Sequence, residues 1–175
     1  MPIKSRIRTI PHHPHQGIMF RDITTLLKDP IGLRTTIQEI SKRYQAHQIN
    51  KVVGIESRGF IIGAPVAYEL EIGFVPIRKQ NKLPAQTISR DYQLEYGSDR
   101  IEIHTDAIQP GDCVLLIDDL IATGGTAEAA VRLIQDMGGT VHECCFVIDL
   151  PDVGGRKRLE KMGCKVFSLC EFEGD

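Results

Sequence analysis

The sequence contains no tryptophan, no long apolar run and no excess of positive charge. A membrane-spanning helix needs about 20 consecutive apolar residues, so we do not expect an integral membrane protein. The formal net charge is −2, whereas domains that bind nucleic acid in general are usually basic. The first residues, MPIKSRIRTIPHHPHQ, lack the apolar segment of a secretory signal. We therefore expect a cytoplasmic protein that binds neither membranes nor nucleic acid.

The sequence also lacks the spacing that a structural metal site would need. Its five cysteines are an odd number and form no C-x-x-C pair, which argues against both zinc and a disulfide framework. Free cysteines in strands behave as small apolar residues, and their presence favours a reducing compartment. The histidines His12, His13 and His15 flank Pro14 in a leading loop, where no regular element would fix them as metal ligands.

Apolar segments typical of strands alternate along the chain with segments of helical periodicity. Apolar residues at Leu33, Ile37, Ile40 and Tyr44 indicate an amphipathic helix, with Asp29-Pro30 as its start. Such alternation predicts an α/β fold with helices flanking a mainly parallel central sheet. We expect helices over 29–48, 57–70, 126–137 and 154–163, and strands over 51–56, 72–79, 113–118, 140–150 and 165–172.

Two segments do not follow this alternation. Residues 1–28 are rich in proline, histidine and arginine, and residues 79–108 are polar, with a turn at Gly97-Ser98. Long excursions in compact proteins are more often functional than incidental. At 175 residues the chain fits one domain, so we predict a single domain over 1–175 that carries both segments.

The segment VLLIDDLIATGGTAEAAVRLI, residues 114–134, combines carboxylates with a loop suited to phosphate. Asp118 and Asp119 end an apolar run, and the residues Ala122 to Thr126 (Ala122, Thr123, Gly124, Gly125, Thr126) lead into the next helix. Unpaired N–H groups at a helix start favour an anion, and glycines let it approach the backbone. The pattern is neither a Walker A loop, because no lysine follows the glycines, nor G-x-G-x-x-G.

A ligand that carries hydroxyls beside a phosphate satisfies both halves of this segment. The carboxylates can accept hydrogen bonds from sugar hydroxyls and stabilise positive charge at an anomeric carbon. The loop of residues 122–126 can hold the phosphate. Ligands in open α/β sheets lie beyond the carboxyl ends of strands, so the loops after residues 53–56 and 115–119 should face one crevice. The segment therefore predicts a ribose 5-phosphate site.

VLLIDDLIATGGTA resembles the phosphoribosyl-diphosphate (PRPP) signature of the type I phosphoribosyltransferases. The segments GIMFRDITTLLKDP, GIESRGFIIGAPVA, RKQNKLP and YQLEYGSDRIEIHTDAI are similar in order and spacing to the family members that act on adenine, and the resemblance covers nearly all of residues 10–172. It implies a type I phosphoribosyltransferase-like fold with a small N-terminal hood over residues 1–28, which binds the base, and a flexible lid within residues 79–108.

The resemblance assigns roles to the polar residues, residue by residue. The loop of residues 122–126 would bind the 5-phosphate, and Asp118 and Asp119 the ribose hydroxyls. The residues expected at the pyrophosphate are Ser57, Arg58, Arg78, Lys79 and Lys82. Those expected to act in catalysis are Arg58, Glu95, Asp118 and Asp119. Glu95 would be the general acid or base, although a carboxylate on a mobile loop could equally position the substrate.

The base would be bound by the segment that contains Met19, Phe20 and Arg21, with Phe20 stacked on a purine and the backbone reading its edge. The resemblance therefore implies transfer of ribose 5-phosphate from PRPP to adenine, giving AMP and pyrophosphate in purine salvage. Mg²⁺ is the implied cofactor. It would be carried mainly by the substrate, with Asp118 and Asp119 as the residues that could bind it through water. The implied assembly is a homodimer.

Two alternatives stay open. The base could be a 6-oxopurine, which would need a side-chain donor that the sequence does not identify. The chain could also be a regulator that senses PRPP without catalysis. Such a regulator would usually add a DNA-binding domain or a basic RNA-binding face, and neither is evident in this sequence.

Overall fold

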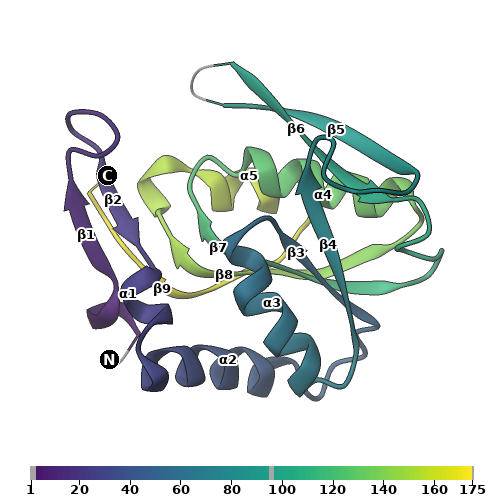
Figure 1. The fold of residues 1–175 in the computed structure, drawn as a ribbon, viewed down its shortest axis with the longest axis horizontal. Helices are drawn as coiled ribbons and strands as arrows, with labels where there is room; N and C mark the ends of the chain where they lie inside the picture. The colour runs from purple at the N-terminus through teal and green to yellow at the C-terminus, as the bar shows by residue number, and fades with distance from the viewer. Residues whose placement is uncertain (1–2, 95–96, 175) are drawn as a thin grey trace.

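The computed structural model describes residues 3–94 and 97–174. Its centre is a seven-stranded sheet with the strand order β5-β6-β4-β3-β7-β8-β9 (Figure 1). Five neighbouring strands are parallel, and β6 and β5 continue the sheet antiparallel. The predicted α/β fold with a mainly parallel sheet is confirmed. The strands are β3 (Lys51–Ile55), β4 (Gly73–Lys79), β5 (Thr87–Gln93), β6 (Ser98–His104), β7 (Cys113–Ile121), β8 (Thr140–Asp149) and β9 (Val166–Glu171).

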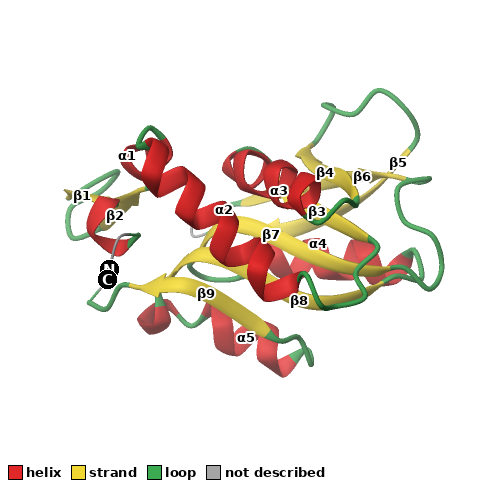
Figure 2. Cartoon of the chain, turned by 90° about the horizontal axis from the view of Figure 1, so that it is seen from below, coloured by secondary structure: helices red, strands yellow, loops and turns green. Residues whose placement is uncertain are grey.

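Helices cover both faces of this sheet (Figure 2). The helices are α1 (Thr24–Leu27), α2 (Pro30–Tyr44), α3 (Arg58–Glu69), α4 (Gly125–Asp136) and α5 (Gly155–Lys161), with short 3-10 turns at Lys4–Arg6 and Pro151–Val153. The start expected for α2 is confirmed, because the Asp29 side chain accepts hydrogen bonds from the N–H groups of Ile31 and Gly32. Within the described residues, no helix has the length and apolar character needed to cross a bilayer.

The strand β7 shows how the sheet divides the core into two layers. Leu115 and Ile117 belong to the buried cluster formed with α2 and α3. Val114 and Leu116 belong to the cluster on the opposite face, which is formed with α4. Successive side chains of a strand point to opposite faces, so an apolar run such as VLLI is buried on both sides.

The excursion over residues 79–108 forms a hairpin that is part of the main sheet. β5 and β6 pair along their whole length, and the end of β4 pairs with β6 through Lys79 and Ile101. Ile101 and Ile103 are buried, which accounts for the weak apolar alternation there. The hairpin is therefore anchored to the core at one end and extends beyond the sheet edge at the other (Figure 1).

The N-terminal segment forms a separate two-stranded sheet from β1 (Arg8–Pro11) and β2 (Met19–Asp22). Arg8 lies opposite Asp22 in this pair, and the two side chains form an ion pair. The last residues of the chain run alongside this small sheet (Figure 1). In the described part of this segment, Ile3, Ile7 and Leu26 pack into the same core cluster as α2 and α3, and the hood over residues 1–28 stays a prediction.

Two element boundaries differ most from those expected, by three or more residues. α2 ends at Tyr44, because the residues up to 48 no longer present apolar side chains at helical spacing. β7 does not stop at Asp118 but continues to Ile121, since its pairing with β8 extends to Ile121 opposite Asp149. The two carboxylates therefore lie on the strand itself, where backbone pairing fixes their positions.

Candidate active site

The candidate site is built where β3 and β7 end side by side. The two strands are parallel neighbours, so the loops that follow them lie at the same edge of the sheet. Gly59 in the first turn of α3 allows close approach, because a Cβ there would lie 2.9 Å from the Ile117 carbonyl oxygen and 3.0 Å from Asp118 Oδ1. The single crevice expected from the sequence is therefore present.

The loop before α4 has the geometry of an anion site. Gly124 has φ +78°, and a Cβ on it would lie 2.9 Å from the carbonyl oxygen of Gly155, so only glycine fits without strain. No side chain caps the start of α4, which leaves its first N–H groups available to a ligand. A cavity of about 200 Å³ lies here, lined by Asp118 and by residues 120–127.

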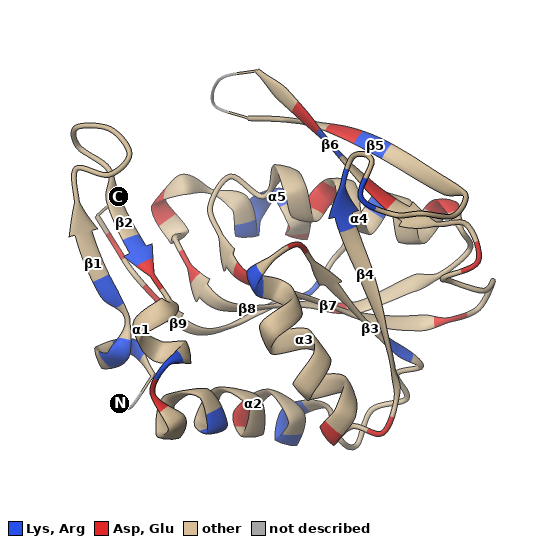
Figure 3. Ribbon diagram, in the orientation of Figure 1, with Lys and Arg blue, Asp and Glu red and all other residues tan. Residues whose placement is uncertain are grey.

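The two carboxylates beside this loop have different partners. Asp119 is buried and accepts a hydrogen bond from Arg58 Nε over 2.6 Å. Asp118 is half-buried, and its Oδ1 accepts the N–H of Asp119 over 2.9 Å. Burial, together with the negative charge of Asp119, raises the pKa of Asp118 well above its usual value. Figure 3 shows the opposite charges side by side at the start of α3 and the end of β7.

A second cavity, of about 350 Å³, continues from the first and shares Asp118 and Thr126 with it. It is lined by Ile55, Glu56, Ser57, Arg58, Lys79, Tyr92, Asp118, Asp119 and Thr126. The peptide bond between Glu56 and Ser57 is cis. The structure thus gathers residues from four separate parts of the chain. Asp118 and Asp119 lie between the anion site before α4 and the basic side chains of Arg58 and Lys79.

The three basic residues expected at this side are not placed alike. Lys79 lines the cavity, whereas Arg78 and Lys82 are not among its lining residues. Arg78 donates to Glu56 Oε2 over 3.3 Å and to the Lys82 carbonyl oxygen over 3.1 Å. Glu56 also accepts the backbone N–H of Lys79 over 2.8 Å. The carboxylate of Glu56 therefore orders the end of β4.

The residues expected to bind the base, Met19, Phe20 and Arg21, are half-buried on β2 and line neither of these two cavities. The Phe20 ring packs edge-on against His13, with ring centroids 5.1 Å apart. Arg21 donates to Thr9 Oγ1 over 2.8 Å. The small sheet thus holds these residues outside the lining of both cavities.

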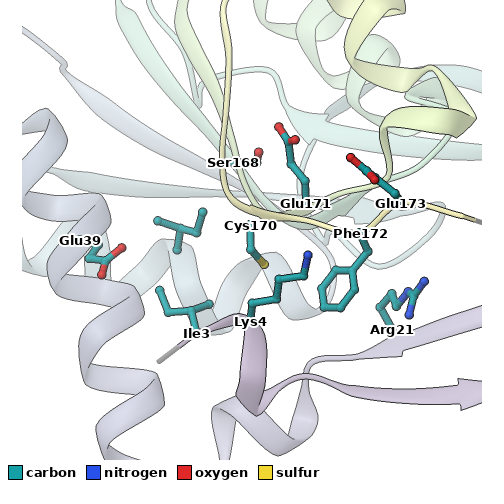
Figure 4. A pocket seen from close by; sticks show the side chains of 10 residues that line it. Ile3, Lys4, Arg21, Glu39, Ser168, Cys170, Glu171, Phe172 and Glu173 are labelled. Atoms are coloured by element: carbon teal, nitrogen blue, oxygen red, sulfur yellow. The ribbon is translucent and has the colours of Figure 1, made fainter. Parts of the chain in front are cut away.

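A third cavity, of about 740 Å³, lies away from the carboxylates, between the N-terminal segment, α2 and β9. Figure 4 shows Arg21, Lys4 and Phe172 among its lining residues. The guanidinium of Arg21 lies 4.6 Å from the Phe172 ring centroid, and the Lys4 ammonium lies 4.8 Å from it. The Arg21 side chain thus lies on the C-terminal tail.

Some expectations lie outside the geometry just described. Glu95, expected as the general acid or base, lies outside the described residues. Among the residues that are described, no group of three or more histidine, cysteine, aspartate or glutamate side chains is arranged to hold a metal ion. His12 instead accepts the N–H of Gly17 at Nδ1 over 3.1 Å.

Several residues that line the site or contact its lining were not among those expected from the sequence. Glu56 and Leu120 lie next to the expected residues and line the cavities, so proximity along the chain was an available signal. Tyr92 lines the cavity of about 350 Å³ that also contains Arg58, and Asp99 contacts Lys79. No sequence signal separates these two from other residues of a polar hairpin.

Comparisons with known proteins identify the family and the fold. A family model described as phosphoribosyl transferase domain matches residues 22–174. The adenine phosphoribosyltransferase of Nitrosospira multiformis is 77% identical over 175 residues, which is the whole of both chains. The crystal structure of adenine phosphoribosyltransferase from Thermoanaerobacter pseudethanolicus superimposes with a TM-score of 0.92 at 45% identity, covering 97% of this chain and 98% of that one. The Saccharomyces cerevisiae enzyme, in complex with an imino-altritol bisphosphate and adenine, gives a TM-score of 0.89 at 36% identity, covering 96% of each chain.

Proposed function

The chain belongs to the phosphoribosyl transferase family, and on that premise we propose that it transfers the 5-phosphoribosyl group of PRPP to adenine, forming AMP and pyrophosphate. One observation carries the proposal. The Asp118–Asp119 pair lies between the anion site at residues 122–126 and a cavity that presents Arg58 and Lys79. This arrangement matches a sugar with a phosphate on one side and a diphosphate on the other.

The proposed binding mode assigns each part of PRPP to one region. The 5-phosphate lies against the uncapped N–H groups at the start of α4 and the hydroxyls of Thr123 and Thr126. Asp118 and Asp119 accept hydrogen bonds from the ribose hydroxyls. The diphosphate lies beside Ser57, Arg58 and Lys79, because a guanidinium fork and an ammonium neutralise phosphate oxygens.

The reaction breaks the bond between the anomeric carbon and the diphosphate oxygen and forms a bond from that carbon to adenine nitrogen. Positive charge develops on the ribose ring as the bond breaks. The nearby carboxylates stabilise this charge, and the cationic groups stabilise the leaving diphosphate. The proton of the adenine imidazole ring must be removed by a base. Glu95 remains our proposed acceptor.

The residues present fit a Mg²⁺ ion that arrives with the substrate. Mg²⁺ is usually bound by one or two carboxylates together with substrate phosphates and water. Asp118 offers oxygen donors in the cavity, while Asp119 is engaged by Arg58. We propose that Asp118 and Asp119 would hold such an ion through water, and that the ion would neutralise charge on the leaving diphosphate.

We propose a homodimer that forms in the cytoplasm. The exposed face of α3 presents Ile61 and Tyr68, 47% and 82% exposed, which lie seven residues apart and therefore on one side of the helix. An interface with a second copy would cover both of these exposed apolar side chains. All five cysteines are free thiols, in keeping with a reducing compartment.

The test is a turnover assay with PRPP and Mg²⁺ that offers adenine, hypoxanthine, guanine and orotate separately and quantifies the nucleotide product. Strong preference for adenine is the expected result. Turnover with a 6-oxopurine would overturn the base assignment and leave the transferase. PRPP binding without turnover on any base would favour the regulator.

A further inference from the structure

We propose that Tyr92 and Asp99 are positioning residues for the reaction: they hold the Lys79 ammonium at the diphosphate side of the cavity. This inference rests on the proposed function, because it concerns how the same site binds its diphosphate. It is carried by a contact of three side chains on two strands of the hairpin and on β4. None of the three neighbours another in sequence.

The three side chains form a closed set of hydrogen bonds. Lys79 Nζ donates to Tyr92 Oη and to Asp99 Oδ2, and Tyr92 Oη donates to the same Asp99 oxygen over 3.0 Å. Tyr92 and Asp99 are direct cross-strand partners in the β5–β6 pair. The Lys79 side chain is therefore hydrogen-bonded to both strands of the hairpin, at the position where Tyr92 pairs with Asp99.

The partners of Lys79 are themselves fixed. Asp99 Oδ1 accepts the N–H of Arg100 over 2.8 Å, which orients the carboxylate. Tyr92 is 6% exposed and belongs to the core cluster on the α4 face. The backbone N–H of Lys79 donates to Glu56. A lysine side chain is otherwise flexible, with about 2 kcal/mol of rotamer entropy to lose on binding, so these contacts pre-order it.

The ordered ammonium remains able to bind a ligand. Lys79 and Tyr92 both line the cavity that contains Ser57, Arg58 and Asp118. An ammonium has three N–H donors, and two are used by Tyr92 and Asp99, so the third can meet a phosphate oxygen. Pre-ordering a binding group improves affinity by removing the cost of ordering it later. Tyr92 and Asp99 should therefore act on diphosphate binding through Lys79 alone.

The test is a double-mutant cycle on Tyr92→Phe and Lys79→Gln. Tyr92→Phe keeps the buried ring and removes only the hydroxyl. We expect it to raise the KM for PRPP, and for pyrophosphate in the reverse reaction, by about 10-fold, the scale of one hydrogen bond to a charged group. The KM values for adenine and AMP should change less than about twofold. In the Lys79→Gln background, Tyr92→Phe should have no further effect on either KM.

Two further variants make the result specific. Asp99→Asn should also raise the KM for PRPP, since Lys79 loses its ionic partner. The matched control is Asp91→Asn, which breaks the exposed Asp91–Arg100 ion pair of the same hairpin and should leave both KM values unchanged. Thermal unfolding of each variant checks that the fold is retained.

The outcomes separate this inference from the proposed function. A Tyr92→Phe effect of equal size in the Lys79→Gln background would overturn the inference, because Tyr92 would then not act through Lys79. A lower KM for PRPP in Asp99→Asn would overturn it as well, because Asp99 would then compete with the diphosphate. Calorimetric binding of pyrophosphate to the same variants keeps the test independent of turnover. If the wild type binds pyrophosphate but makes no AMP, the proposed function fails, and the binding cycle still decides the inference.

Discussion

Arg58 and Asp119 form an ion pair between the start of α3 and the end of β7, with Nε and Oδ2 2.6 Å apart. The carboxylate is buried, and the guanidinium is about half exposed, so Arg58 spans from the core to the crevice. Burial opposes the charge of Arg58, but the Asp119 carboxylate outweighs it, and the pKa of Arg58 is raised. The pair thus holds a permanent cation beside the proposed diphosphate. The predictions below begin from this arrangement of charges.

Removing both carboxylates should abolish the chemistry and keep the fold. In the double variant Asp118→Asn/Asp119→Asn, the charge on the ribose ring loses its stabilisation, and turnover should fall by about 10²–10³-fold or more. Steady-state turnover with PRPP and adenine measures the loss, and circular dichroism checks the fold. Near-normal turnover would show that the pair does not serve the reaction.

The two carboxylates should have opposite effects on stability. The pKa of Asp118 is raised in the folded chain, so keeping it ionised at neutral pH costs stability, and this cost grows as the pH rises through the folded pKa. We expect Asp118→Asn to raise the melting temperature at pH 7 by about 2–4 °C, the shift that about 1 kcal/mol produces in a chain of this size. Asp119→Asn should lower it, because Arg58 loses its partner.

The gain in Asp118→Asn should shrink as the pH falls, since the wild-type carboxyl becomes protonated and neutral. Melting curves of both single variants between pH 4 and pH 8 measure this. A melting temperature of Asp118→Asn that stays below that of the wild type at every pH would contradict the prediction.

Gly124→Ala should impair PRPP binding beyond its effect on stability. A Cβ at Gly124 would lie 2.9 Å from the backbone of Gly155, and the alanine would have to keep the left-handed φ of +78° that the loop imposes. Such a conformation costs roughly 1–2 kcal/mol for a residue other than glycine. We expect a lower melting temperature and an increase of at least about 10-fold in the KM for PRPP, because the loop must shift.

Gly111→Ala is the matched control for that substitution. Gly111 has φ +88°, and a Cβ there meets no atom within 4 Å, so it carries the strain without the collision. Its melting temperature should also fall, by less than in Gly124→Ala because only the strain is present, while the KM for PRPP is unchanged. An equal rise of this KM in both variants would mean that lost stability explains the effect.

Asp22 should stabilise the N-terminal unit in a pH-dependent way. Hydrogen bonds from Arg8 and Thr24 lower the pKa of Asp22 to about 2. The group therefore contributes stability that is fully present above its unfolded pKa of about 3.9 and is lost as the pH falls through the folded pKa of about 2. The difference in free energy of unfolding between the wild type and Asp22→Asn should be largest near neutral pH and decrease steadily as the pH falls through this range. A difference independent of pH would assign the effect to packing.

Removal of Mg²⁺ should stop turnover without unfolding the chain. Since the ion is proposed to arrive with PRPP, chelation should abolish AMP formation and leave the melting temperature of the free protein within about 1 °C. A structural metal would stabilise the folded state in the absence of substrate. A large drop in melting temperature on chelation would therefore place a metal in the free protein.

The sequence predicts the layers of the fold, and it predicts the carboxylates and the anion-binding loop of the site, because these features follow from local pattern. The buried run at 114–117 and the loop at 122–126 each appear as continuous segments, and parallel strands bring their ends together. The contact of Tyr92, Lys79 and Asp99 could not be predicted, because it depends on cross-strand register within a polar hairpin. A one-residue slip would turn Tyr92 to the other face. The differing placements of Lys79 and Arg78 follow from the same alternation and from Glu56, and no local pattern contains that information.

The position of β3 in the middle of the sheet has a consequence for synthesis on the ribosome. β3 is complete by residue 55, yet one of its two partners, β7, begins only at Cys113. Until β7 leaves the exit tunnel, the emerging chain has an apolar strand, β3, with one edge unpaired. No ligand can stabilise this strand, because the pocket does not yet exist. Closing a segment of this length is slow compared with forming local helices. The nascent protein therefore passes through an interval in which binding of substrate cannot protect it from aggregation.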